Sequence, residues 1–567
     1  MLRRYWIWGT VLTMSGWLVV GCGSASAHRL AAKSRPTRAA VVRLPDPSGS
    51  SDWPAEKLAQ AHAHYAAGVI HEMNEEPEAA LQEYYQAALN DPDNETLVLD
   101  VSRRFLHSKQ LEKALEILSR AASRPQASGA IYARLGIVYA QLGKTEQAVT
   151  ASRVAIKRAP ESLAGYQTLL LTYLQNKREV EAWKILEEAA RRSNPGAEFL
   201  IGLAELYGQY AVQVPGQKAK AQAQALGVLT RAAKLSPSNP GLRLRLADCF
   251  NLLGENAKAA QLYLDLLKQL PDLPLVQERV HAKLAEIYLR GSDNQKAAEQ
   301  LEAIVKADPT NPLAYYYLGS LSYEAKKPAE AADYFTKTVL LRPEFEQAYY
   351  DLALAQISLN KTNEAMVTLD KARGKFPQNF VCELLTGMVY SRQKAYPEAI
   401  KHYTAAEVIA KATDPKRLNQ GFYFQLGSAY ERTGDFVQAE RYFEKCLELA
   451  PDFHEAMNYL GYMWAEHGTK LDQARALIEK AVKAEPKNAA YLDSFAWVLF
   501  KLNQPKEALG YVLKAIELSE EPDATVYDHL GDIYAALNQR DKAREAWTKS
   551  LALEPNDQVR HKLEPGR

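Results

Sequence analysis

The sequence of 567 residues is 47% apolar and 24% charged, which is ordinary for a folded soluble chain and excludes collagen-like, wholly disordered and polytopic membrane proteins. At about 150 residues per domain, this length corresponds to about four domains. The 69 basic residues nearly balance the 68 acidic ones and there are only four cysteines, so neither wholesale nucleic-acid binding nor a disulfide framework is indicated.

The N-terminal segment reads MLRRYWIWGTVLTMSGWLVVGC. Two arginines precede an uncharged stretch over residues 5–20, which has the length of a secretory signal and falls short of the ~20 apolar residues that a spanning helix needs. The closing VVGC resembles the lipobox of bacterial lipoproteins, in which a lipid-modified cysteine becomes the first residue of the mature chain. This resemblance implies a lipoprotein signal peptide over residues 1–21 and lipidation of Cys22.

Two other interpretations of this segment stay open: a plain signal peptide cut near Ala25 or Ala27, and an uncleaved anchor helix. The lipobox is favoured because a cysteine directly after the apolar stretch is unusual in so cysteine-poor a chain. We therefore expect a lipid anchor in a bacterial membrane, with the protein facing the periplasm. In enterobacterial lipoproteins an Asp after the cysteine retains the protein in the inner membrane, so Gly23 favours the outer membrane.

Residues 22–54 are predicted to form the lipidated cysteine and a flexible tether. After the cysteine, this segment is rich in Ala, Ser, Arg and Pro and holds only two acidic residues, a composition typical of linkers. Contact of its basic residues with anionic lipid headgroups is an alternative to a solvated linker.

A repeat of about 34 residues fills the rest of the chain. One alanine marks each unit: Ala80, Ala114, Ala148, Ala182, Ala225, Ala259, Ala297, Ala331, Ala365, Ala399, Ala439, Ala474, Ala508 and Ala543. Eight of the thirteen intervals are 34 residues, which is the period of tetratricopeptide (TPR) repeats. We therefore predict an all-α TPR solenoid, a right-handed superhelix of about fourteen repeats over residues 55–557, followed by a C-terminal cap over residues 558–567.

Other positions of the repeat fit the same family. The unit that ends at Pro451 carries Tyr423, Leu426, Gly427, Tyr430, Gly434, Ala439 and Phe443 at the expected offsets. Gly at the eighth position and Ala at the twentieth allow the two helices of a unit to cross closely, and the large residue at the twenty-fourth fills the gap between neighbours. Proline then ends the second helix. Because one helix pair cannot bury its apolar face alone, the units must stack.

No catalytic or metal motif occurs in the sequence. There is no nucleophile elbow, phosphate loop or Cys-x-x-Cys pair, and the zinc-protease-like start at His71-Glu72 lacks its second histidine because residue 75 is Glu. Cys249, Cys382 and Cys446 fall on helices, where buried hydrophobes are expected. We predict no cofactor and no metal, and a protein that is not an enzyme; an unrecognised active site in the groove is the alternative.

A partner-binding groove is expected on the concave face, which TPR proteins line with the second, fifth, ninth and twelfth positions of each first helix. The predicted groove residues are Tyr316, Tyr323, Tyr350, Leu354, Met388, Phe424, Asn458, Tyr462, Asp493, Trp497 and Asp528. The aromatic members suit an extended or helical peptide, and acids beside aromatics suit a partner with Lys or Arg. The alternatives are that superhelical closure buries part of this stripe and that the acids are ordinary solvated residues.

The block from Tyr459 to Trp547 contains LGYMWAEHG, YLDSFAWVLFKL and DHLGDIYAALNQRDKAREAW. It resembles the C-terminal part of outer-membrane TPR lipoproteins, of which one group serves as adaptors that bring cell-wall hydrolases to a periplasmic carboxyl-terminal processing protease. The resemblance implies a membrane-anchored scaffold whose partners are proteins and not nucleic acids. The alternative is a structural component of a polysaccharide-export or secretion machine.

Overall fold

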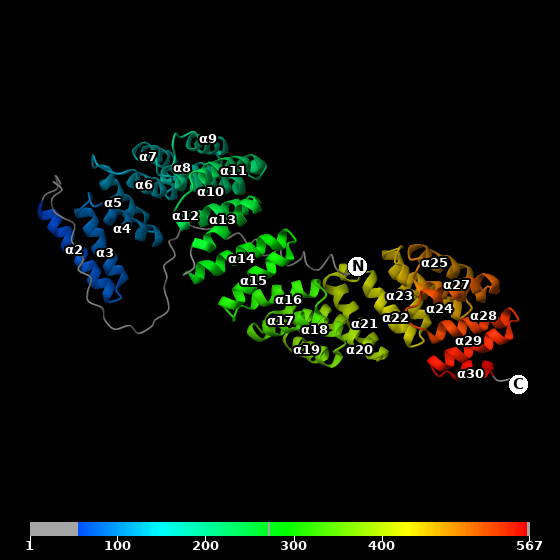
Figure 1. Cartoon of the computed structure of the whole chain (residues 1–567). Coiled ribbons are helices and arrows are strands. Elements are labelled where there is room, and N and C mark those ends of the chain that lie inside the picture. Colours follow the sequence, from blue (N-terminus) through cyan, green and yellow to red (C-terminus); the bar gives the residue numbers. More distant parts are fainter. Residues whose placement is uncertain (1–54, 270–272, 564–567) are drawn as a thin grey trace. The chain divides into compact units, whose positions relative to one another are not determined.

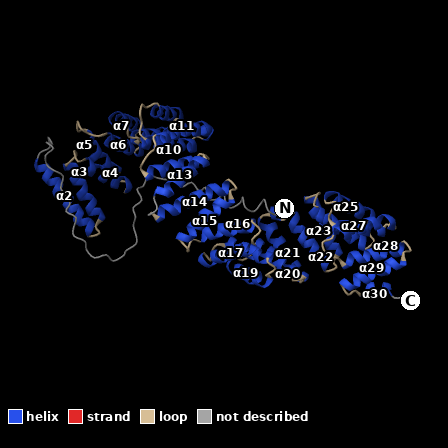
Figure 2. Ribbon diagram, viewed as in Figure 1, coloured by secondary structure: helices blue, strands red, loops and turns tan. Residues whose placement is uncertain are grey.

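The computed structural model describes residues 55–269 and 273–563. In this part the chain forms 29 α-helices and no strand, which confirms the prediction of an all-α fold (Figures 1 and 2). The helices fall into two compact units, divided between residues 303 and 304.

The helices before the division are α2 (Ala55–Met73), α3 (Pro77–Asn90), α4 (Glu95–His107), α5 (Leu111–Ala122), α6 (Gly129–Gln141), α7 (Thr145–Arg158), α8 (Ala164–Gln175), α9 (Glu179–Ala190), α10 (Ala197–Gln213), α11 (Lys218–Lys234), α12 (Pro240–Leu252), α13 (Asn256–Gln269) and α14 (Pro274–Arg290). Helix α15 (Asn294–Ala307) spans the division.

The helices of the second unit are α16 (Pro312–Glu324), α17 (Pro328–Leu341), α18 (Glu346–Ser358), α19 (Thr362–Lys375), α20 (Phe380–Arg392), α21 (Tyr396–Thr413), α22 (Gln420–Arg432), α23 (Phe436–Leu449), α24 (His454–Glu466), α25 (Leu471–Ala484), α26 (Ala489–Lys501), α27 (Pro505–Leu518), α28 (Ala524–Ala536), α29 (Arg540–Leu553) and α30 (Asp557–Leu563). The even-numbered helices from α2 to α28 are the first helices of the repeats, and most of them pack mainly against the helix that follows.

Side-chain size explains the close crossing of the two helices in a repeat. All fourteen marker alanines are buried, with at most 2% of their surface exposed. At the eighth position, a Cβ atom on Gly319 would lie 2.7 Å from the ring of Phe335, the twenty-fourth residue of the same repeat. The same pair recurs as Gly68 and Tyr84, where the distance is also 2.7 Å. The small residue therefore makes the space that the aromatic ring fills.

Two insertions into the 34-residue repeat lengthen helices and add a short 3₁₀ turn. In the fifth repeat, α10 and α11 each have 17 residues and enclose a 3₁₀ turn at Pro215–Gln217. In the tenth repeat, α21 has 18 residues and is followed by a 3₁₀ turn at Pro415–Arg417. The extra residues therefore extend the repeat and leave the stacking positions in register.

The segments predicted as signal peptide and tether, including Cys22, lie outside the described residues. Within residues 55–269 and 273–563, we found no helix with the length and apolar character needed to cross a bilayer. The segment predicted as a cap begins within helix α30, where Val559 is buried.

Candidate functional site

The predicted groove residues lie on the first helices of the second unit, from α16 to α28. Those that are half-buried are Tyr316, Tyr323, Leu354, Met388, Phe424, Tyr462 and Asp528. Those that are buried are Tyr350, Asn458, Asp493 and Trp497. We call the surface formed by these eleven residues the first-helix face; its role in binding stays a prediction.

The burial of Tyr350, Asn458, Asp493 and Trp497 differs from the expectation that these positions line an open groove. Tyr350 is 3% exposed and packs in a hydrophobic cluster with residues of the next repeat, such as Leu385. Trp497 is 6% exposed and belongs to a cluster that includes Tyr527 and Leu530 of the following repeat. Stacking of repeats therefore buries part of the stripe, as the alternative interpretation held.

Contacts between the fifth position of one first helix and the sixth position of the next run through this unit. The Tyr316 hydroxyl donates to Asp351 over 2.9 Å, and the ring of Phe424 meets that of Tyr459 edge-on with centroids 5.2 Å apart. The same two positions are filled by Asp493 with His529 and by Asp528 with Lys562. Sequence reasoning missed these sixth-position partners, although a polar residue recurring there was a visible signal.

The contact between Asp493 and His529 is buried. The Nδ1 atom of His529 lies 3.0 Å from both carboxylate oxygens of Asp493, and the imidazole stacks on the indole of Trp497. Burial acts against the charged imidazolium, but the charge and hydrogen bond of Asp493 outweigh it, so the pKa of His529 lies above its usual value. The two carboxylates Glu466 and Asp528 act in the same direction. This arrangement favours an imidazolium–carboxylate pair that joins two repeats.

The acids near the C-terminus are paired within the chain. The Lys562 ammonium lies 2.8 Å from a carboxylate oxygen of Asp528 and 2.8 Å from one of Asp532. Asp532 also accepts a hydrogen bond from the indole Nε1 of Trp547 over 3.1 Å. Burial nevertheless raises the pKa of Asp532. Lys562 therefore occupies the place that we had expected a basic residue of a partner to take.

Some buried polar atoms on the first-helix face have no hydrogen-bond partner within the described residues. They include the acceptor Asn458 Oδ1 on α24 and the donor Trp497 Nε1 on α26. Both residues stand at predicted groove positions on neighbouring first helices. A buried polar atom without a partner costs ~1–3 kcal/mol, so both atoms lower the stability of the free protein.

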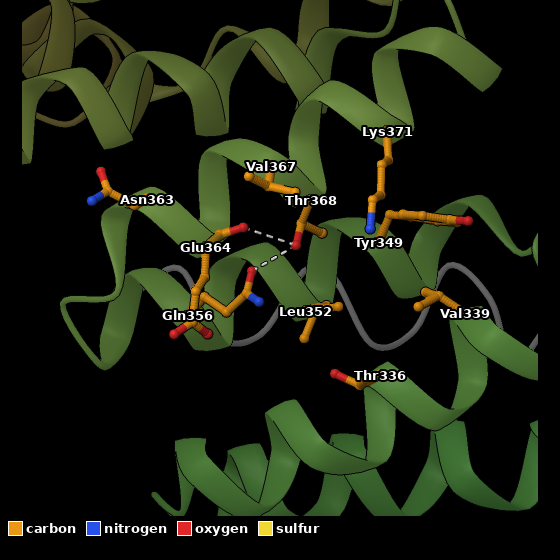
Figure 3. Close-up of a pocket in the computed structure, with 10 residues that line it drawn as sticks. All are labelled: Thr336, Val339, Tyr349, Leu352, Gln356, Asn363, Glu364, Val367, Thr368 and Lys371. Atoms are coloured by element: carbon orange, nitrogen blue, oxygen red, sulfur yellow. Dashed lines mark hydrogen bonds between the residues drawn. The ribbon is translucent and has the colours of Figure 1, made fainter.

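A pocket of about 420 Å³ lies on a different surface of the same unit (Figure 3). Helices α17, α18 and α19 line it with Thr336, Val339, Tyr349, Leu352, Gln356, Asn363, Glu364, Val367, Thr368 and Lys371. Inside it, the Thr368 hydroxyl lies 2.9 Å from Gln356 Oε1 and 3.1 Å from the Glu364 carbonyl oxygen. None of the predicted groove residues lines this pocket.

The cysteines and the acidic residues show no arrangement for redox or metal chemistry in the described ranges. Cys249, Cys382 and Cys446 are buried free thiols, and burial raises the pKa of Cys382 to about 11. A thiol with so high a pKa is a weak nucleophile at neutral pH. No three His, Cys, Asp or Glu side chains of residues 55–269 and 273–563 come together in a group that could hold a metal ion.

Five family models match the chain, and each is described as a tetratricopeptide repeat. The matched residues are 134–162, 218–287, 283–348, 322–381, 383–452, 424–489 and 524–557. Together these ranges cover more than half of the chain and include most of the first-helix face.

Among similar proteins, a TPR repeat-containing protein of Pseudomonas aeruginosa is 28% identical over 227 residues, or 39% of this chain and 36% of that protein. A type IV pilus assembly protein of the same organism is 29% identical over 136 residues, or 24% of this chain and 53% of that protein. The matched stretch thus spans about a third to a half of these relatives. A solved structure, the APC/C hetero-tetramer Cut9–Hcn1, matches 82% of this chain and 94% of its own with 16% identity and a TM-score of 0.39.

Proposed function

Because the chain is a tetratricopeptide repeat protein, we propose that it is a non-catalytic scaffold that binds segments of other proteins along the first-helix face. Proteins of this family generally mediate protein–protein interactions. The proposed ligand is an extended or helical segment that lies across the first helices α16 to α28. Half-buried aromatic residues such as Phe424 and Tyr462 would supply apolar contact area.

The observation that carries this proposal is the pair of unpartnered atoms Asn458 Oδ1 and Trp497 Nε1. One accepts and the other donates, and both are closed to solvent in the free protein, so a ligand that bonds to them must part the side chains around them. A bound main chain has an N–H for the asparagine oxygen and a carbonyl for the indole nitrogen. A ligand with this chemistry would relieve the cost that the free protein carries at both atoms.

A lipid anchor at Cys22 would hold this scaffold at a bacterial membrane, facing the periplasm and most consistently at the outer membrane. Each buried methylene of an acyl chain contributes ~0.8 kcal/mol, so several chains give stable attachment. In its sharpest form the proposal makes the protein an adaptor that brings cell-wall hydrolases to a periplasmic processing protease.

A second candidate function is that of a structural or assembly component of an export or secretion machine. The observation that favours it is the 29% identity, over 24% of this chain, to a protein named for type IV pilus assembly. Affinity capture from membrane extract, with the partners identified by mass spectrometry, separates the two: a protease or hydrolase supports the adaptor, and machine subunits support the second candidate.

The groove itself is tested with Asn458→Leu. The leucine removes the unpartnered acceptor and keeps a similar volume, so the free energy of unfolding should not fall. Capture of the identified partner should weaken about tenfold, the value of one hydrogen bond to a buried group. The control is Glu479→Gln on α25, outside the first-helix face. Capture by Asn458→Leu equal to that of the control would refute the proposed site.

The anchor is tested separately with Cys22→Ser. We expect loss of radiolabelled acyl incorporation and release of the protein from the membrane fraction. If both labelling and membrane association survive the substitution, the proposed lipid anchor is wrong. The proposed binding groove does not depend on this result. Assays of the purified protein alone against cell-wall and peptide substrates test the alternative of an enzyme.

A further inference from the structure

Two arginines on neighbouring first helices of the unit that precedes residue 304 lie near enough for the charge of one to act on the other. Arg103 stands at the ninth position of its repeat on α4, and Arg134 stands at the sixth position of the next repeat on α6. The side chain of Arg103 is 60% exposed and pairs with Asp100 of its own helix. Arg134 is half-buried, and within the described residues its guanidinium makes no hydrogen bond or ion pair.

Another pair in this unit occupies the same two repeat positions, but it has a carboxylate at the ninth position. Arg245, at the sixth position of α12, bonds to Glu205, at the ninth position of α10, through Nε at 3.0 Å and Nη2 at 2.7 Å. The two residues are 40 positions apart, and nine of these positions belong to the insertion of the fifth repeat. Arg103 and Arg134 are therefore equivalent to Glu205 and Arg245, with an arginine where the carboxylate should be.

Asp100 pairs with both Arg103 and Arg104, so its single carboxylate already serves two guanidinium groups. The second, fifth, ninth and twelfth positions of α4, α6 and α8 carry no acid and are mostly apolar. Burial and the positive charge of Arg103 lower the pKa of the Arg134 guanidinium. A half-buried guanidinium beside a second cation on an apolar face is costly unless an anion comes between them.

We propose that Arg103 and Arg134 form a binding site for the carboxylate of an Asp or Glu in an otherwise apolar segment of a partner protein. The planar guanidinium groups suit a carboxylate that accepts two parallel hydrogen bonds, as Glu205 does from Arg245. The apolar positions around them suit the flanking side chains. This site lies in the unit before residue 304, so it is independent of the first-helix face described above.

The test uses a phage-displayed library of random twelve-residue peptides, selected on the purified protein without residues 1–21 and on Arg103→Gln/Arg134→Gln. We expect the first selection to enrich Asp and Glu between apolar residues, and the double variant to lose this enrichment at least tenfold. The control is Arg191→Gln, an exposed arginine at the end of α9. Equal acidic enrichment on both proteins, or none on either, overturns the proposal.

A second variant tests the missing carboxylate directly. Arg103→Glu recreates the arrangement of Glu205 with Arg245, so an internal carboxylate should fill the site. We expect this variant to lose the acidic enrichment while its thermal midpoint stays at or above that of Arg103→Gln. Retained acidic enrichment, or unfolding at a lower temperature than Arg103→Gln, would contradict the proposed site. Circular dichroism establishes that each variant is folded before selection.

Discussion

The imidazole of His529 lies on the indole of Trp497, with ring centroids 4.0 Å apart and planes inclined by 16°. The histidine belongs to α28 and the tryptophan to α26, so this stacking joins the first helices of two successive repeats. Because Asp493 on α26 holds the same imidazole, one helix supplies both an apolar and an ionic contact. The C-terminal repeats are therefore coupled by a titratable group.

Stability should consequently depend on the protonation of His529. Its pKa is raised in the folded state, so the stabilisation is fully present below the unfolded value near 6.5 and is lost as pH rises through the higher folded value. We expect the free energy of unfolding of the wild type to exceed that of His529→Gln by more at pH 6 than at pH 9. Urea unfolding at both pH values measures this difference.

The control for that experiment is His107→Gln, because His107 lies exposed at the end of α4. It measures how the loss of an exposed histidine changes the free energy of unfolding at the two pH values. If the difference for His529→Gln changes with pH no more than that of the control, His529 does not carry the charge that its contacts favour.

Protonation of Asp351 also favours the folded state at lower pH, although here the protonated form is neutral. Burial raises its pKa to about 6, although hydrogen bonds from Gln347 and Tyr316 act against this. The folded state therefore binds the proton more tightly than the unfolded chain, and Asp351 adds stability as pH falls from about 6 to about 4. Relative to Asp351→Asn, the wild type should gain roughly 3 kcal/mol over this range. Unfolding of both proteins at pH 7 and pH 4.5 checks the sign; a constant difference would contradict it.

Tyr350 and Trp497 should act on stability before they act on binding. Both are buried in clusters that join repeats, so substitution by alanine should cost ~3–5 kcal/mol of unfolding free energy. Phe424 and Tyr462 are half-buried, and their alanine variants should cost less stability and lose more capture per folded molecule. Unfolding and capture are measured on all four variants. If stability falls while capture per folded molecule stays at the wild-type level in all four, the partner docks elsewhere.

The repeat was predictable because packing imposes it at fixed spacing. Ala365, like every marker alanine, could be placed in the core from the sequence, since only a small residue fits the helix crossing. The first-helix face was less predictable, because its exposure depends on how closely the next repeat stacks. The period places Trp497 at the ninth position, but it does not reveal that His529 of the following repeat covers its ring.

Ala365 provides a direct test of the crossing. Ala365 lies on α19 and is fully buried where this helix packs against α18. Ala365→Leu should therefore overpack the contact and lower the free energy of unfolding by about 1–3 kcal/mol. The control is Val367→Leu on the same helix, where the side chain is exposed. Denaturant unfolding of the two variants should separate them; equal midpoints would show that the crossing tolerates larger residues.

Lys562 should stabilise the last repeat by compensating the charges of Asp528 and Asp532. Its ammonium is within 2.8 Å of both carboxylates, and all three side chains are less than a third exposed. Replacing it by methionine leaves the two acids uncompensated, and we expect a loss of about 1–3 kcal/mol. Because the loss arises from the remaining charges, Asp528→Asn/Asp532→Asn added to Lys562→Met should restore most of it. Hydrogen exchange of α28 and α29 follows the effect locally, since stability in a solenoid depends on neighbouring repeats. If the triple variant exchanges as fast as Lys562→Met, the lysine acts through packing of α30 and not through its charge.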